Sequence, residues 1–157
     1  MEKIALFPGS FDPFTIGHQS IVNRSLPLFD KIIIAVGYNT QKKNLLGLEK
    51  RMQLIRDVFL GNVKIEVDHY QGLTIDYCTK VNASYLLRGL RTAVDFEYER
   101  AIGQMNKAMN PAIETVFLLT DPEFSFVNST IVRDILFFGG DASKFLPPGV
   151  DIKKYLS

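Results

Sequence analysis

Residues 7–18, with the sequence Phe-Pro-Gly-Ser-Phe-Asp-Pro-Phe-Thr-Ile-Gly-His, decide the fold class of this chain. The short apolar run Ile4–Phe7 leads into them, and an amphipathic stretch, Gly17–Phe29, follows. An apolar run that ends at Pro and Gly and gives way to a helical period is typical of a strand, its exit loop and a helix. The glycine and lysine spacing of the two common phosphate loops is absent. The stretch therefore predicts a strand–loop–helix unit of another kind.

The loop of this unit carries residues suited to an anionic ligand. Gly9 lets the backbone approach a ligand closely, and Pro13 stiffens the loop. Thr15 can cap the helix, which would place His18 in the first helical turn. Free N–H groups and the helix dipole favour anions there, and an imidazole can donate a hydrogen bond to a phosphate oxygen. The alternative is a capping turn with a surface histidine, but the presence of Gly, Ser and Thr in the same loop favours a ligand site.

Short apolar runs alternate with amphipathic stretches along the whole chain. Strands are expected at Ile4–Phe7, Lys31–Val36, Val63–Val67, Tyr85–Leu87 and Thr115–Leu119. Helices are expected at Gly17–Phe29, Leu48–Phe59, Thr74–Val81, Val94–Met109, Ser129–Phe138 and, as a short last element, Val150–Leu156. Uniformly apolar strands indicate a parallel sheet buried on both faces, with right-handed βαβ crossovers. We therefore expect residues 1–157 to form one α/β domain, a doubly wound, parallel, five-stranded sheet that binds ligands beyond the carboxyl ends of its strands.

The composition is that of an ordinary globular protein. Of the 157 residues, 46% are hydrophobic and 22% charged, and the net charge is +1. A genome-binding protein usually has a basic stripe and a high pI, so we expect no nucleic-acid partner. No run approaches the roughly 20 apolar residues of a membrane span, so no membrane partner is expected either. The one cysteine, Cys78, fits a cytoplasmic protein and is expected in the core, whereas His69 is expected at the surface.

Basic residues follow two further strands of the expected sheet. Gln41-Lys-Lys-Asn44 comes after the second strand, and Arg88-Gly-Leu-Arg91 comes after the fourth. Both segments leave the sheet at the edge where the His18 turn lies, and the guanidinium fork matches phosphate geometry. The structural alternatives are solvated lysines, and arginines that pair with nearby carboxylates. The carboxylates available for such pairs are Asp95, Glu97 and Glu99.

A polar segment follows the fifth strand and opens a helix. It is Phe124–Thr130, and it ends in Asn128, Ser129 and Thr130. Such side chains cap the free N–H groups of a helix start. The same N–H groups can cradle a triphosphate, so this segment is a second candidate for phosphate binding.

Two sets of motifs resemble a known family. Gly-Ser-Phe-Asp-Pro at 9–13 and Thr-Ile-Gly-His at 15–18 are similar to the signature of the nucleotidyltransferase superfamily. Arg-Gly-Leu-Arg at 88–91, followed by Asp-Phe-Glu-Tyr-Glu at 95–99, resembles the pattern of bacterial phosphopantetheine adenylyltransferases over essentially the whole chain. The resemblance implies a Rossmann-like nucleotidyltransferase fold. It also implies transfer of AMP from ATP to 4′-phosphopantetheine, giving 3′-dephospho-coenzyme A and pyrophosphate in the penultimate step of coenzyme A biosynthesis.

The resemblance also implies roles for individual residues. The catalytic residues would be His18, Lys42 and Arg91. The ATP-binding residues would be Ser10, Phe11, His18, Gly89, Leu90, Arg91, Glu99, Phe124, Ser125, Phe126, Val127, Asn128, Ser129 and Thr130. The acceptor would be bound by Ser10, Lys42, Thr74 and Arg88. The family typically has three serines at 128–130, so the contribution of Asn128 is an open question.

The implied reaction is a direct in-line attack by the acceptor phosphate on the α-phosphorus of ATP, without a covalent enzyme intermediate. His18 would donate to the α-phosphate, Lys42 would hold the attacking phosphate, and Arg91 with the Ser129 region would take the leaving pyrophosphate. Mg²⁺ is expected with ATP, bound mainly by phosphates and water, because no carboxylate cluster suggests a protein metal site. The resemblance further implies a homohexamer, a dimer of trimers. Val94–Met109 and Phe137-Phe138 could supply its apolar contacts or belong to the core.

Two alternatives remain beside this reading. One is another nucleotidyltransferase of the same superfamily, such as a pyridine-nucleotide adenylyltransferase or a cytidylyltransferase, which would share the first motif. The Arg88–Glu99 block argues against it. The other is a non-catalytic nucleotide sensor on the same sheet topology, since fold alone does not fix function. A sensor needs neither a histidine at the α-phosphate nor a second anion site, which makes it the weaker alternative.

Overall fold

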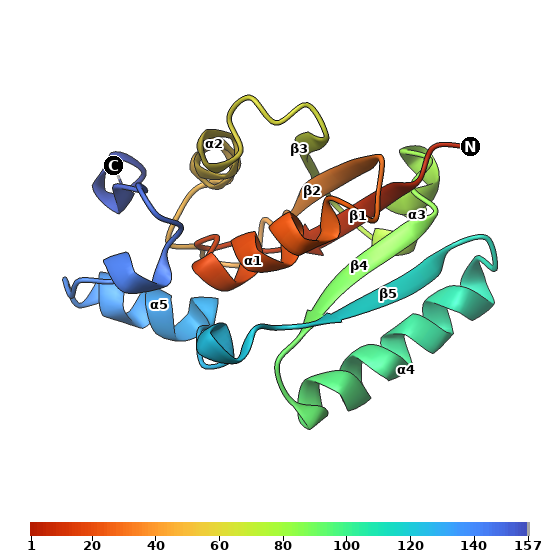
Figure 1. Cartoon of the computed structure of the whole chain (residues 1–157). Helices are drawn as coiled ribbons and strands as arrows, with labels where there is room; N and C mark the ends of the chain where they lie inside the picture. The colour runs from red at the N-terminus through yellow and green to blue at the C-terminus, as the bar shows by residue number, and fades with distance from the viewer. Residues whose placement is uncertain (157) are drawn as a thin grey trace.

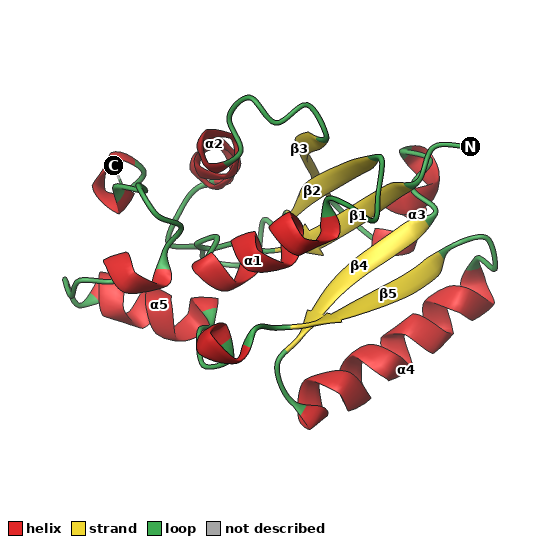
Figure 2. Cartoon of the chain, viewed as in Figure 1, coloured by secondary structure: helices red, strands yellow, loops and turns green. Residues whose placement is uncertain are grey.

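The computed structural model describes residues 1–156 and has five strands in one sheet with helices on both sides (Figures 1 and 2). The strands are β1 (Ile4–Gly9), β2 (Lys31–Gly37), β3 (Ile65–Tyr70), β4 (Tyr85–Leu90) and β5 (Glu114–Leu119). The α-helices are α1 (Ile16–Ser25), α2 (Leu48–Val58), α3 (Thr74–Lys80), α4 (Ala93–Met109) and α5 (Ser129–Phe137). Three short 3₁₀ turns are η1 (Pro122–Phe124), η2 (Ser143–Phe145) and η3 (Ile152–Lys154).

All neighbouring strands are parallel, in the order β3-β2-β1-β4-β5. The chain first builds outward from β1 to β3 and then returns to place β4 on the other side of β1. Side chains of α1 and α2 share one core cluster with one face of the sheet, and those of α3 share a cluster with the opposite face. This confirms the expected single-domain, doubly wound, Rossmann-like sheet. Its switch point lies between β1 and β4, where such folds bind their ligands.

The central strand β1 and its neighbour β2 are apolar because both of their faces are covered. Ile32, Ile34 and Val36 of β2 point into the cluster with α1 and α2, whereas Ile33 and Ala35 point into the cluster with α3. All five are at most 2% exposed. Burying such a side chain fully stabilises the fold by roughly 1.5–3 kcal/mol for the larger ones, so this strand anchors the sheet.

Several element boundaries differ from the sequence prediction. β3 begins at Ile65, not Val63, and Val63 is 99% exposed. The register explains the shift, because β3 pairs with β2 from Ile65 to Tyr70, beyond the predicted end of the strand. The last expected helix is reduced to the turn η3.

The first helix also ends earlier than predicted. α1 stops at Ser25, two residues before Pro27, which has no N–H group with which to continue the helical hydrogen bonds. Leu28, which lies in the last turn of the predicted helix, is 49% exposed, whereas Phe29 is buried.

The strand β4 is longer than its apolar run. It continues through Leu90, pairing with β5 along its whole length. Arg88 and Gly89 thus lie within the strand and not in the loop after it. Their backbone is held by the sheet, which fixes the base of the Arg88 side chain.

The remaining sequence expectations concern single residues and the membrane. Cys78 is fully buried, as predicted, and burial raises the pKa of its thiol to about 11. His69 is exposed on β3, also as predicted. Across residues 1–156, none of the helices has the length and apolar character that crossing a bilayer requires.

Candidate active site

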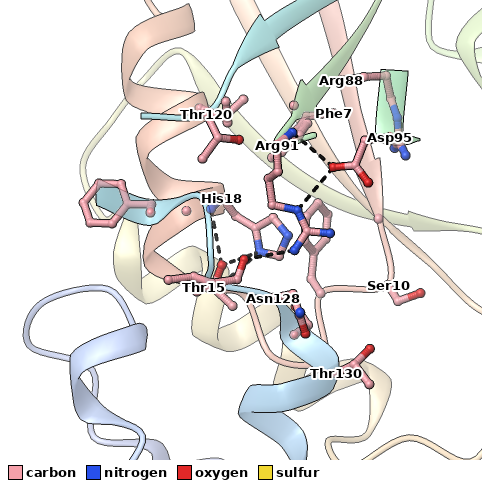
Figure 3. Close-up of a pocket in the computed structure, with 18 of the residues that line it drawn as sticks. Phe7, Ser10, Thr15, His18, Arg88, Arg91, Asp95, Thr120, Asn128 and Thr130 are labelled. Carbon is pink, nitrogen blue, oxygen red and sulfur yellow. Dashed lines mark hydrogen bonds and ion pairs between the residues drawn. The ribbon is translucent and has the colours of Figure 1, made fainter. Parts of the chain in front are cut away.

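Two cavities lie side by side at the carboxyl ends of the strands. The large cavity measures about 540 Å³ and lies between the β1–α1 loop, the end of β4 and the start of α5 (Figure 3). The small cavity measures about 440 Å³ and lies between the ends of β2 and β3 and helix α4. They share a wall made of Pro8, Gly9, Ser10, Lys42, Arg88 and Glu99. Two ligands, one in each cavity, would therefore meet at this wall.

His18 occupies the first turn of α1 and faces the large cavity (Figure 3). The side chain of Thr15 accepts a hydrogen bond from the His18 backbone N–H, which confirms the predicted cap. The imidazole in turn reaches back, and its Nδ1 accepts a hydrogen bond of 2.9 Å from the Thr15 backbone N–H. An Nδ1 that accepts this bond carries no proton, so the neutral ring carries its proton on Nε2. The backbone thus selects the tautomer.

The surroundings of His18 keep it neutral. Its ring packs against Phe7, Phe11 and Phe14, with ring centroids 5.0 to 6.3 Å apart. Burial among these rings lowers the pKa of His18 to about 3, with further lowering by the positive charges of Arg91 and then Arg88. The side chain is therefore a neutral hydrogen-bond donor at physiological pH and not a proton-transferring acid.

Arg88 is held by protein groups on all sides of its guanidinium. Its Nε and Nη2 donate to the carboxylate of Glu99, at 3.0 and 2.6 Å, and its Nη1 donates to the Pro8 carbonyl at 2.9 Å. The ion pair that the sequence offered as the structural alternative is thus present. Arg88 and Glu99 nevertheless both line the wall between the cavities, so the pairing orients the arginine at that wall.

Arg91 bridges the end of β4 and the start of α5. Its Nη1 donates to the Val127 carbonyl at 3.1 Å, and its Nε lies 3.5 Å from the carboxylate of Asp95. The same carboxylate accepts the backbone N–H of Arg91 at 3.1 Å (Figure 3). These contacts fix the guanidinium in the large cavity close to His18, whose pKa it lowers.

The start of α5 presents its polar residues to the large cavity. Asn128 is the N-cap, and its Oδ1 accepts the Ile131 N–H at 2.8 Å. Ser129 donates to the Pro13 carbonyl at 2.9 Å, which ties α5 to the β1–α1 loop. Thr130 accepts from Arg133 at 3.2 Å. The capping role offered for this segment is confirmed, and Asn128 performs it as a serine would.

Lys42 lies in the loop between β2 and α2 and lines both cavities. Within residues 1–156 its ammonium group makes no ion pair and no hydrogen bond, unlike the two arginines. Lys43 lines neither cavity. Lys42 is therefore a cation at the shared wall that is available to an anionic ligand.

Most residues predicted for the site lie around the two cavities. All four acceptor residues, Ser10, Lys42, Thr74 and Arg88, line the small cavity. The large cavity is lined by these predicted ATP residues: Ser10, Phe11, His18, Gly89, Arg91, Glu99, Phe124, Val127, Asn128, Ser129 and Thr130. Three predicted ATP residues, Leu90, Ser125 and Phe126, do not line it; Leu90 is buried and Phe126 is 66% exposed.

The cavities also contain residues that sequence reasoning missed. In the large cavity these include Thr120 and Arg133, and in the small cavity Tyr38, Asn39, Tyr70, Ile102 and Asn106. Two of them carried a usable signal. Thr120 directly follows β5, at the sheet edge where ligands were expected, and Arg133 lies one helical turn beyond Ser129.

This chain is similar to a nucleotidyltransferase family model and to several adenylyltransferases. The model of the cytidylyltransferase-like family matches residues 6–135. The phosphopantetheine adenylyltransferase of Flavobacterium psychrophilum is 50% identical over 149 residues, which cover 95% of this chain and 98% of the relative. That of Leptospira biflexa is 49% identical over 158 residues and covers 99% of both chains.

The chain belongs to the phosphopantetheine adenylyltransferase family. The solved structure of a putative nicotinate-nucleotide adenylyltransferase from Vibrio parahaemolyticus is also similar, with a TM-score of 0.74, 21% identity and 99% coverage of both chains. At that identity the likeness shows the fold alone. The family of nucleotidyltransferases to which the chain belongs is thus the one that its sequence motifs resemble.

The geometry of His18 gives a prediction for nuclear magnetic resonance. Between about pH 5 and pH 8 the His18 ring should remain neutral with its proton on Nε2, because Thr15 N–H occupies Nδ1 and the folded-state pKa is about 3. Two-bond ¹H–¹⁵N spectra of the imidazoles measure this directly. The chain has only two histidines, so the His69→Ala variant assigns the His18 signals. An Nδ1–H tautomer, or an imidazolium at pH 6, would contradict the account.

Proposed function

We propose that this protein transfers the adenylyl group of ATP to 4′-phosphopantetheine, giving 3′-dephospho-coenzyme A and pyrophosphate, in the penultimate step of coenzyme A biosynthesis. The observation that carries the proposal is the wall shared by two cavities, with Lys42, Arg88 and the neighbouring His18 around it. One anionic ligand on each side of this wall brings two phosphates together. That arrangement serves a transfer between them, which a binding site for a single nucleotide does not need.

We assign ATP to the large cavity. Arg91, Arg133 and the N-terminus of α5 gather there, and such groups together favour a polyphosphate. Gly89 lines this cavity and also lets α1 pack closely on β4, since a methyl group on it would lie 3.1 Å from the Ile21 side chain.

We assign 4′-phosphopantetheine to the small cavity. Lys42 and Arg88 provide positive charge for its phosphate at the shared wall. Away from the wall the cavity is lined by Tyr38, Tyr70 and Ile102, with Asn106 as an amide partner. Apolar side chains with a few hydrogen-bonding groups suit the uncharged amide arm of this acceptor.

The step is a single displacement at phosphorus. An oxygen of the acceptor phosphate forms a bond to the α-phosphorus, and the bond from that phosphorus to the bridging oxygen of the β-phosphate breaks. The leaving pyrophosphate keeps the electron pair of the broken bond. The acceptor phosphate is already ionised near neutral pH, so no enzyme base has to remove a proton. Catalysis then rests on positioning and on charge stabilisation.

The protein supplies hydrogen bonds and positive charge to this step. The Nε2–H group of His18 donates a hydrogen bond to an α-phosphate oxygen as negative charge builds up there. The proton stays on the imidazole. Lys42 holds the attacking phosphate at the shared wall, and Arg91 with the start of α5 stabilises the departing pyrophosphate. His18, Arg91 and Lys42 are therefore the proposed catalytic residues.

We expect Mg²⁺ to bind together with ATP, as part of the nucleotide substrate. Among residues 1–156, no group of three or more His, Cys, Asp or Glu side chains is placed to hold a metal ion. The carboxylates of the large cavity, Asp95 and Glu99, are paired with Arg91 and Arg88. These residues do not form a metal site, so we propose that Mg²⁺ is bound by the phosphates of ATP and by water, and we assign it no protein ligand.

Two adjacent lysines test the assignment of Lys42. The Lys42→Met variant should lose about 10²- to 10³-fold in kcat, because a fixed positive charge at the transferring phosphates is removed. Lys43→Met, which changes a lysine outside both cavities, should keep the activity. Pyrophosphate release measures both variants, with ATP, Mg²⁺ and 4′-phosphopantetheine. Equal activity of the two variants would contradict the role of Lys42.

A panel of acceptors tests the reaction itself. 4′-Phosphopantetheine should support pyrophosphate release, whereas nicotinate mononucleotide with ATP, and glycerol 3-phosphate with CTP, should not. Turnover with nicotinate mononucleotide alone would instead favour a pyridine-nucleotide adenylyltransferase. Tight binding of ATP without release from any acceptor would leave a nucleotide sensor.

We further propose that the protein is cytoplasmic and assembles as a homohexamer, a dimer of trimers. The support on the chain is helix α4, none of whose 17 residues is buried although it carries several apolar side chains. Val94, Tyr98 and Met105 are each at least 66% exposed. Exposed apolar side chains that gather on one helix are typical of an interface. Multi-angle light scattering should give six times the chain mass of 17.8 kDa, and a stable monomer would refute the assembly.

A further inference from the structure

A buried charged cluster joins the two loops that meet at the shared wall. Asp12 belongs to the β1–α1 loop and is 2% exposed, whereas Arg51 belongs to α2 and is 1% exposed. Both contact the backbone of Leu46, in the loop from β2 to α2 that also carries Lys42. We call Asp12, the Leu46 backbone and Arg51 the Leu46 clamp.

Asp12 and Arg51 bind the two backbone polar groups of Leu46, its N–H and its carbonyl. The Asp12 carboxylate accepts the Leu46 N–H at 2.8 Å with one oxygen and the Leu45 N–H at 2.9 Å with the other. Arg51 donates from Nε to the Leu46 carbonyl at 3.1 Å. Its Nη1 donates to the Ser10 carbonyl at 2.8 Å. The clamp thus connects Ser10 in the first loop to a segment only three to four residues beyond Lys42.

Burying the charged side chains of Asp12 and Arg51 fixes the positions of the loops more than it stabilises the fold. Removing charged groups from water is costly, and apolar side chains of similar size often stabilise a core equally well. Desolvation lowers the pKa of Arg51, with the charge of Asp12 as the largest opposing influence. What offsets this cost is fixed direction: four backbone groups of the two loops, the Leu45 and Leu46 N–H groups and the Leu46 and Ser10 carbonyls, each have a buried charged partner.

In the part of the chain that the structure describes, residues 39–44 of the Lys42 loop are fixed only by hydrogen bonds among themselves. The Lys42 N–H donates to the Asn39 carbonyl at 3.2 Å, and the Asn44 side chain donates to the Lys42 carbonyl at 3.3 Å. Among the hydrogen bonds of residues 1–156, the links from this loop to the β1–α1 loop are those of the Asp12 carboxylate. The distance between Lys42 and His18 therefore depends on the clamp.

We propose that Asp12 and Arg51 are positioning residues that hold Lys42 at the correct distance from Ser10 and His18 for adenylyl transfer. Neither side chain lines a cavity, so both act through the loops that they join. A displacement of about 1 Å of a catalytic group can cost about 10²-fold in rate. This inference rests on the proposed function, because the transfer step is what the positioning serves.

The test combines conservative variants with a double-mutant cycle. Asp12→Asn keeps the shape but leaves one of two N–H groups without its acceptor, and Arg51→Lys keeps the charge but can reach only one of two carbonyls. Each variant should lower kcat at least about tenfold, whereas the Kd of ATP, measured without acceptor, should change less than about threefold. Circular dichroism and thermal melts establish that each variant is folded.

The cycle separates positioning from a general loss of structure. Adding Asp12→Asn to Lys42→Met should cost less than about threefold further, because the residue through which it acts is already gone. Added to Lys43→Met, it should still cost its full factor. The same pair of backgrounds with Arg51→Lys repeats the test if Asp12→Asn does not fold.

The results can distinguish a failure of the positioning role from a failure of the proposed function. An inactive wild-type protein would refute the function itself. An active wild-type protein with both variants within about twofold of its kcat would overturn the clamp. A loss of equal size in the Lys42→Met and Lys43→Met backgrounds would also overturn it, because the effect would then not pass through Lys42.

Discussion

The structure of the site depends on how the backbone carbonyls of one loop are held. Carbonyl oxygens of the β1–α1 segment, at Pro8, Ser10, Asp12 and Pro13, each accept a hydrogen bond from a side chain of another element. The donors are, in the same order, Arg88 of β4, Arg51 of α2, and Arg133 and Ser129 of α5. Three of these four donors are guanidinium groups, which bind such acceptors with fixed direction. The loop is thereby shaped before any ligand arrives.

This constraint gives His18 its chemical character. The rigid loop presents Thr15 N–H to Nδ1 and surrounds the ring with phenylalanines, so the imidazole stays neutral and keeps its proton on Nε2. A neutral donor beside the two arginines stabilises developing charge without adding a further full charge to the site. Arg88 and Arg91 are themselves held by Glu99 and Asp95, which makes the positive field of the site preorganised.

The sequence predicted the parts of the site that local chemistry determines. Thr15 as a cap, His18 in the first turn and the polar start of α5 follow from rules about strand exits and helix ends, and the structure has all three. The sheet topology followed from the alternation of strands and helices. The start of β3 was wrong for a long-range reason: it depends on the register with β2, which single-strand periodicity does not contain.

The difference between local chemistry and the arrangement of the folded chain also explains which site residues were missed or misplaced. Leu90, Ser125 and Phe126 belong to segments that do enter the large cavity, but neighbouring residues of a segment point in different directions. Arg51 was not expected, because an arginine in an amphipathic helix is ordinarily a surface residue. Only the folded chain shows that Arg51 bonds the Ser10 carbonyl and shares the Leu46 backbone with Asp12 in the interior.

The central claim is that two fixed phosphates react directly, without an enzyme nucleophile between them. The stereochemistry at the α-phosphorus tests this claim most directly. The reaction would be run with one diastereomer of ATP bearing sulfur at the α-phosphate, and the configuration of the thio-substituted product would be determined. A single in-line displacement predicts inversion at phosphorus. Retention would mean two displacements through a covalent enzyme intermediate, and would contradict the account.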